Sequence, residues 1–159
     1  MREGLTFVDI GCGEGFFAIV AARMIGASGK VIGVDINEKS ITRLRERANS
    51  EGLDNLSVFV ASAEEADICV ACADIVFFGI DLHDFKDARK ALKNARRMLK
   101  PTGKLVDVDW KKKWMLKGPP ASIRFSQEFA SRLIQEAGFK IDASEDSGPM
   151  HYLIIAGLA

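Results

Sequence analysis

The chain has 159 residues, the size of a single domain, and hydrophobic residues make up 48% of it. Its 22 basic and 22 acidic side chains balance, so no overall charge draws it to nucleic acid or to a membrane surface. No apolar run approaches the ~20 residues that a membrane span needs, and the N-terminus lacks the pattern of a secretory signal. We therefore expect one cytoplasmic domain over residues 1–159.

The cysteines give no sign of a disulfide framework or of a metal site. Their number is odd, with Cys69 and Cys72 in a C-x-x-C spacing and Cys12 far from them. A zinc site would need a second pair or nearby histidines, and the two histidines are His83 and His151. We expect free thiols that serve as small apolar side chains, and no metal.

The predicted elements alternate between strand and helix along the chain. In chain order they are a strand over Leu5–Ile10, a helix over Glu14–Met24, a strand over Lys30–Asp35, a helix over Glu38–Ser50, a strand over Leu56–Val60, a short helix over Ala63–Asp67, a strand over Ala73–Ile80, a helix over Lys86–Leu99, a strand over Lys104–Asp109, a helix over Gln127–Ala137, and strands over Lys140–Ser144 and Tyr152–Gly157. This alternation predicts an α/β fold with a mostly parallel, Rossmann-like sheet and helices on both faces. The last two strands predict an antiparallel hairpin.

Local signals support several of these elements. Asn37 and Ser126 are of the type that caps the start of a helix, and Gly52 is of the type that ends one. The run Ala73–Ile80 is almost continuously apolar, as expected of a central parallel strand covered on both faces.

A glycine-rich turn after the first strand is the strongest chemical signal. Gly11, Gly13 and Gly15 form it, and Asp35 ends the next strand, where its carboxylate can accept bonds from a ribose diol. Phe16 replaces the third glycine of the dinucleotide fingerprint, which argues against NAD, and no Gly-Lys-Ser/Thr follows, which excludes a Walker loop. A glycine turn that binds no ligand is the alternative.

The pattern Asp9-x-Gly11-x-Gly13-x-Gly15 resembles motif I of the class I S-adenosylmethionine (SAM) methyltransferases. In that family the glycine turn lies under the methionine part of SAM, and the acidic residue after the second strand holds the ribose. The resemblance implies SAM as cofactor and S-adenosylhomocysteine (SAH) as its product. It implies that the cofactor-binding residues are Asp9, Gly11, Cys12, Gly13, Gly15, Asp35, Ile36, Ser62, Ala63 and Gly79.

The resemblance extends over essentially the whole chain. It implies a seven-stranded sheet of order 3-2-1-4-5-7-6 in which the seventh strand is antiparallel. The segment Leu99–Leu105 is similar to the L-K-P-G-G-x-L turn of the type 11 methyltransferases, with Thr102 in place of the first glycine. The segments around Asp81–Asp84 and Asp109–Lys112 resemble a small archaeal and bacterial subgroup of that family, for which we know of no settled substrate.

Two departures from the family pattern bear on the site. Ser62 stands where family members usually carry an acidic residue that accepts from the adenine amine, and Glu64 could compensate if it turned inward. Only Met1–Gly4 precede the first strand, so the N-terminal helices that cover the cofactor in family members are not expected. We expect an open site, unless the Trp110–Ile123 loop or a second subunit of a homo-oligomer closes it.

The acceptor side of the site is expected where the fourth and fifth strands end. His83 could act as a general base oriented by Asp84. The alternative for His83 is a helix-cap or packing histidine, and the alternative for Asp84 is a cap of the following helix. Asp81, Trp110 and Arg124 are expected to bind the acceptor, with Arg124 suited to a carboxylate or phosphate. A surface salt bridge is the alternative for Arg124.

These signals predict a SAM-dependent methyltransferase that acts on a small molecule. The basic run Lys111–Lys113 is short, and no Asn-Pro-Pro-Tyr type motif follows the fourth strand, so nucleic acid is not the expected partner. The alternatives are a non-catalytic SAM-binding or partner module and, with less support, an RNA or protein methyltransferase.

Overall fold

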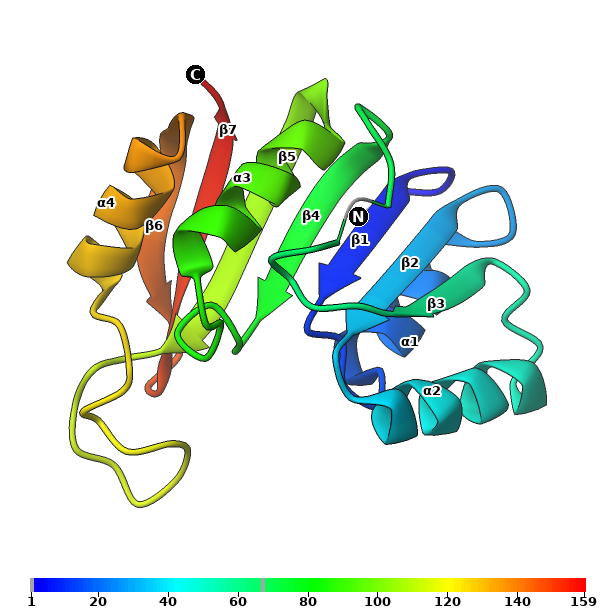
Figure 1. The fold of residues 1–159 in the computed structure, drawn as a ribbon, viewed down its shortest axis with the longest axis horizontal. Helices are drawn as coiled ribbons and strands as arrows, with labels where there is room; N and C mark the ends of the chain where they lie inside the picture. The colour runs from blue at the N-terminus through cyan, green and yellow to red at the C-terminus, as the bar shows by residue number, and fades with distance from the viewer. Residues whose placement is uncertain (1, 67) are drawn as a thin grey trace.

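The computed structural model describes residues 2–66 and 68–159, which form a seven-stranded sheet flanked by four helices (Figure 1). The elements are β1 (Thr6–Ile10), α1 (Phe16–Ile25), β2 (Lys30–Asp35), α2 (Glu38–Ser50), β3 (Leu56–Val60), β4 (Ala73–Gly79), α3 (Ala88–Met98), β5 (Leu99–Trp110), α4 (Gln127–Glu136), β6 (Phe139–Ser147) and β7 (His151–Leu158). In the described part of the chain no helix is long and apolar enough to cross a membrane.

The strand order is β3-β2-β1-β4-β5-β7-β6, and this confirms the predicted topology. Neighbours from β3 to β5 are parallel, whereas β7 runs antiparallel to both β5 and β6. Because parallel strands end at one edge, the carboxyl ends of β1, β2, β4 and β5 are brought together there.

The helices cover the two faces of the sheet in pairs. In Figure 1, α3 and α4 lie in front of the sheet, and α1 lies behind it. Side chains that alternate along β1 and β4 divide accordingly: Val8 and Phe78 join the core under α3 and α4, while Phe7 and Phe77 join the core under α1 and α2. Helices on both faces are therefore confirmed.

Helix starts follow the capping chemistry in three cases. The Asn37 side chain accepts hydrogen bonds from the backbone N–H groups of Lys39 and Ser40, and Ser126 caps α4. Helix α3 is capped by Asp87 rather than by Asp84, so it begins two residues later than predicted. The alternative interpretation of Asp84 as a helix cap is therefore wrong.

The short helix predicted over Ala63–Asp67 is not formed. Residues 63–65 make a hydrogen-bonded turn, closed by a bond from the N–H of Glu65 to the carbonyl of Ser62, and Asp67 lies outside the described residues. A single turn lacks the successive hydrogen bonds that offset the unfavourable free energy of helix nucleation.

The expectation of free thiols is wrong for two of the three cysteines. Cys69 and Cys72 form a disulfide with their Cα atoms 6.0 Å apart, and Cys12 is free and buried. The segment folds back because Ala71 has a positive φ of 48°, and the N–H groups of Ala71 and Cys72 bond to carbonyls at the end of α3. That turn brings the two Cβ atoms within reach, which the odd cysteine count did not indicate. The cytoplasmic location stays a prediction.

Candidate cofactor and acceptor site

A cavity of about 330 Å³ opens at the carboxyl edge of the sheet, beside the glycine turn. The lining residues come from the ends of β1, β2 and β3 and from the segment after β4: Gly11, Val34, Asp35, Ile36, Ala61, Ser62, Ala63, Glu64, Asp81, Asp84, Phe85 and Lys86. Five of them were predicted to bind cofactor: Gly11, Asp35, Ile36, Ser62 and Ala63. The cavity thus lies where the sequence places an adenosine-containing ligand.

The glycine turn is shaped by three positive φ angles. Gly11, Gly13 and Gly15 have φ values of 80°, 51° and 85°. A Cβ on Gly15 would lie 2.2 Å from Leu44, so this glycine is required for packing against α2. A Cβ on Gly13 would meet nothing within 4 Å, so the backbone here is exposed to whatever the site binds. Such an open cradle fits the cofactor that the resemblance implies.

Asp35 is held in a fixed orientation by the backbone. One carboxylate oxygen accepts from the N–H of Gly13 and the other from the N–H of Asn37, each at 2.8 Å. Because a carboxylate has about four lone-pair sites, acceptor capacity is left on the cavity side. That arrangement suits the two hydroxyls of a ribose.

Asp9 and Cys12 lie beneath the turn rather than in the cavity wall. Asp9 is 1% exposed, and burial raises its pKa to about 7, against the backbone N–H of Ala18 and with help from Asp35. The Cys12 sulfur packs against the backbone of Gly33, and burial together with Asp9 and Asp35 raises the thiol pKa. These two residues support the turn from below.

Gly79 also has a packing role in this structure. A Cβ there would lie 2.6 Å from the Phe77 ring and 2.7 Å from the Phe17 ring. The glycine therefore lets two aromatic rings close over the end of β4. It is not among the residues that line the cavity.

Glu64 turns toward the cavity, on the side where Ser62 replaces an acidic residue. Its Oε1 accepts from the N–H of Asp87 at 3.0 Å, at the start of α3. Partial burial by itself raises the pKa of Glu64, but the bonds from backbone N–H groups outweigh it, and the net shift is downward. Glu64 is thus an ionised residue of the cavity wall that remains partly exposed to solvent.

His83 is oriented by a carboxylate that the sequence did not single out. Its Nδ1 lies 2.8 Å from Oδ2 of Asp109, and both side chains are buried. Asp84 lies on the other side of the ring, 3.5 Å from Nε2, with an exposed side chain that lines the cavity. The predicted pairing is therefore corrected: Asp109 orients the ring, and Asp84 stands between the ring and the cavity.

Burial lowers the pKa of His83, but the hydrogen bond and the charge of Asp109, with Asp84, outweigh it, so the net shift is upward. Asp109 was missed because it sits two residues beyond Asp107 in an ordinary buried strand pattern. Only the pairing of β4 with β5 brings the end of β5 beside the segment after β4.

Arg124 does not face an acceptor. It is 2% exposed, and all five N–H groups of its guanidinium donate to backbone carbonyls. Those carbonyls belong to Lys111, Lys113, Lys117 and Pro119. No donor is left for a carboxylate or phosphate, so the structure contradicts both the predicted acceptor role and the salt-bridge alternative.

Trp110 belongs to the same loop. The Arg124 guanidinium carbon lies 5.3 Å from the centre of its ring, and the Trp110 ring packs against His151. A Cβ on Gly118 would lie 2.9 Å from the ring, so the loop backbone covers the indole. Trp110 and Arg124 thus organise residues 111–124, and neither lines the cavity.

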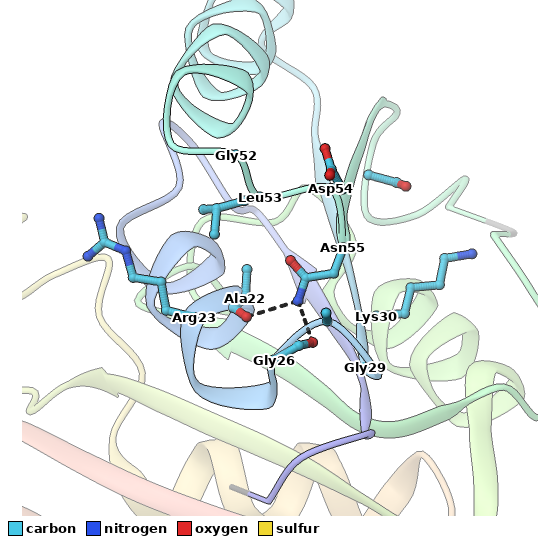
Figure 2. A pocket seen from close by; sticks show the side chains of 11 residues that line it. Ala22, Arg23, Gly26, Gly29, Lys30, Gly52, Leu53, Asp54 and Asn55 are labelled. Atoms are coloured by element: carbon cyan, nitrogen blue, oxygen red, sulfur yellow. Dashed lines mark hydrogen bonds between the residues drawn. The ribbon is translucent and has the colours of Figure 1, made fainter.

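Another hollow, of about 480 Å³, lies at the opposite edge of the sheet (Figure 2). There the Asn55 amide donates to the carbonyls of Ala22 and Gly26, at 2.9 and 2.8 Å. The amide joins the turn after α1 to the start of β3, and the hollow is remote from the glycine turn. The cavity at the carboxyl edge is the functional candidate.

Replacing Gly13 by asparagine should abolish SAM binding without unfolding the chain, because the new side chain enters the open cradle. Asparagine tolerates a left-handed backbone better than most residues. Gly52 is a matched control, since it has a φ of 65° and open space around its Cα. Isothermal titration should show no SAM binding to Gly13→Asn and unchanged binding to Gly52→Asn. Equal affinities in the two variants would contradict the cradle.

Removing the carboxylate of Asp35 should weaken SAM binding more than tenfold. Charge-assisted hydrogen bonds to the ribose contribute about 1.5–3 kcal/mol, and the two bonds to Gly13 and Asn37 are also altered. The dissociation constant of Asp35→Asn, measured by titration, tests this. An unchanged constant would exclude a ribose role.

Arg124→Ala should lower the free energy of unfolding by about 2–4 kcal/mol, because buried carbonyls lose charged donors. SAM affinity should stay within about twofold. Arg89→Ala, which removes an exposed ion pair with Glu136, is the control and should change stability little. Urea unfolding measures both. An Arg124→Ala variant that is as stable as wild type but binds SAM poorly would show that Arg124 has a binding role and not a structural one.

Comparison with known proteins agrees with this geometry. A family model described as a methyltransferase domain matches residues 1–143. The chain is 31% identical over 113 residues to the ubiquinone/menaquinone biosynthesis C-methyltransferase UbiE of Escherichia fergusonii, covering 70% of this chain and 45% of that protein. The chain thus spans about half the length of the curated relatives it matches.

Solved structures show the same architecture. A SAM-dependent methyltransferase from Aquifex aeolicus superposes with a TM-score of 0.95 at 27% identity, covering 99% of this chain and 84% of that one. A Sulfolobus solfataricus protein classed with the type 11 methyltransferases has a TM-score of 0.78 at 25% identity, covering 96% and 83%. With the glycine turn, Asp35 and the cavity in place, the chain belongs to the family of SAM-dependent methyltransferase domains.

Proposed function

We propose that this chain transfers the methyl group of SAM to a small-molecule acceptor that gives up a proton in the reaction. The observation that carries the proposal is the Asp84–His83–Asp109 arrangement beside the cofactor cavity. The UbiE relatives, named for C-methyl transfer, support a small-molecule acceptor. SAM supplies an electrophilic methyl group on a sulfonium, and the protein supplies orientation and charge.

The proton is proposed to leave through Asp84 and His83. Asp84 has an exposed carboxylate on the cavity wall, and among the described residues Nε2 of His83 has no hydrogen-bond partner. Asp109 keeps the Nδ1 side of the ring protonated, so Nε2 is the basic nitrogen. Nε2 of His83 would take up the proton that the acceptor gives up, by way of Asp84, and bound SAM would supply the methyl group that the acceptor receives.

One observation favours a second candidate, a SAM-binding module without catalysis. The His83 side chain is only 1% exposed, so an acceptor reaches Nε2 only if Asp84 moves or relays the proton. In that case the histidine would be a link between β5 and the segment after β4. Turnover with an acceptor separates the two candidates.

The test uses a panel of phenols, enols and quinols, with SAH formation as the readout. Asp109→Asn and His83→Gln should lower kcat by about 10²–10⁴-fold while leaving the SAM dissociation constant within about twofold. Activity should rise with pH through the His83 pKa, which lies above its ordinary value, because the base must be neutral. Asp142→Asn, an exposed strand position, should behave as wild type.

Two results would contradict the proposal. Wild-type rates in both the Asp109→Asn and the His83→Gln variants would mean that the base lies elsewhere or that no base is needed. SAM binding without turnover of any member of the panel would favour the binding module.

A further inference from the structure

Asp81 is aimed at the glycine turn by an unusual backbone. The preceding residue, Ile80, has a φ of 72°, a left-handed conformation that costs a β-branched side chain energy. Its N–H is held by the carbonyl of Val108 at 2.7 Å, which keeps the strained turn in place. As a result, Oδ2 of Asp81 lies 2.7 Å from the position that a Cβ on Gly11 would occupy. Strain of this kind is found where a side chain must be placed for function.

This placement moves Asp81 from the expected acceptor side to the cofactor side. Asp81 and Gly11 line one cavity together with Asp35, which faces the ribose position. Within the described residues, no N–H or O–H group of the chain donates to the Asp81 carboxyl. The Asp81 carboxyl is therefore a titratable group that faces the cavity.

The groups that face Asp81 are of one sign. They are Asp9 from β1, Asp35 from β2, Asp109 from β5 and Asp84 from the same segment. Lys86 is the one cation among the residues that line the cavity. Burial, followed by these four carboxylates, raises the pKa of Asp81 to about 8, so its carboxyl is mostly neutral at pH 7 in the free protein.

We propose that Asp81 is the residue by which this site distinguishes SAM from SAH, because its carboxyl ionises against the sulfonium charge that only SAM carries. The two ligands share the adenosine and the amino-acid group, and they differ in the methyl group and in the charge on sulfur. Asp35 is expected to bind the ribose, which both ligands carry, so its direct contacts should not distinguish them. The inference concerns the cofactor site, and it does not depend on which acceptor is methylated or on whether His83 acts as a base.

The consequence is a site whose preference changes with the reaction. A cation beside Asp81 lowers its pKa and releases a proton to solvent. In SAH the sulfur is a neutral thioether, and the Asp81 carboxyl takes a proton back among the neighbouring carboxyl groups. The attraction that favours SAM is then lost, which assists release of SAH.

Isothermal titration in two buffers of different ionisation enthalpy measures this directly at pH 7. SAM binding to the wild type should release a substantial fraction of one proton, and SAH binding should release much less. In Asp81→Asn, which keeps the shape of the side chain, the difference between the two ligands should disappear. The wild-type preference for SAM should also grow by up to about tenfold per pH unit as pH rises toward 8.

Two control variants frame the result. Asp35→Asn should weaken SAM and SAH alike, and the difference in proton release should persist at a smaller size, because the Asp35 charge helps to raise the pKa of Asp81. Asp142→Asn, which is exposed and pairs with Lys104 far from the cavity, should match wild type. Circular dichroism confirms that each variant is folded, and the wild-type comparison of SAM with SAH needs no variant.

Three results would overturn the inference. The first is equal proton release on binding SAM and SAH. The second is an Asp81→Asn variant with the wild-type preference and its pH dependence. The third is failure of both ligands to bind the wild type. A chain that shows the predicted proton release but methylates no acceptor would refute only the proposed function.

Discussion

The junction between the ends of β1 and β2 is the constraint on which the site depends. The N–H groups of Gly11 and Cys12 both donate to the carbonyl of Val34, at 2.8 and 3.0 Å. Asp35, the next residue, in turn accepts from the N–H of Gly13. Backbone donors of the glycine turn are thus satisfied by the end of β2. The same bonds fix the glycine turn and the Asp35 carboxylate relative to each other.

Several carboxyl groups on β1, on β5 and in the segment after β4 are shielded from water. Asp9, Asp81 and Asp107 all have raised pKa values, in each case mainly because burial disfavours the charged form. Among the residues that line the cavity, Lys86 is the one cation, so these carboxyl groups have few positive partners in the free protein. The positive charge of SAM would supply what the site lacks, as inferred for Asp81, and the cost of burying carboxyl groups would then contribute to cofactor recognition.

The loop of residues 111–124 is held by a different interaction, the hydrogen bonds of one buried arginine. Residues 111–124 carry basic side chains, yet their conformation is organised by one buried cation, Arg124, whose donors all bond to the loop's own carbonyls. Such a loop has a defined shape without a core of its own. It lies after β5, beside the edge where the dyad of His83 and Asp109 stands, and so it borders the region proposed for the acceptor.

The sequence by itself determined the alternation of strands and helices, the glycine turn and Asp35, because glycine spacing, strand periodicity and a carboxylate at a strand end are local patterns, whereas the strand order was implied by the family resemblance. The family resemblance extended these signals to the whole sheet. Tertiary structure alone decided the partners of the charged groups. Asp109 reaches His83 only because β5 pairs with β4, and Arg124 turns inward because four backbone carbonyls converge on it. The Cys69–Cys72 bond likewise depends on a turn anchored to α3. Contacts between residues distant in sequence depend on packing and strand pairing, which no local pattern records.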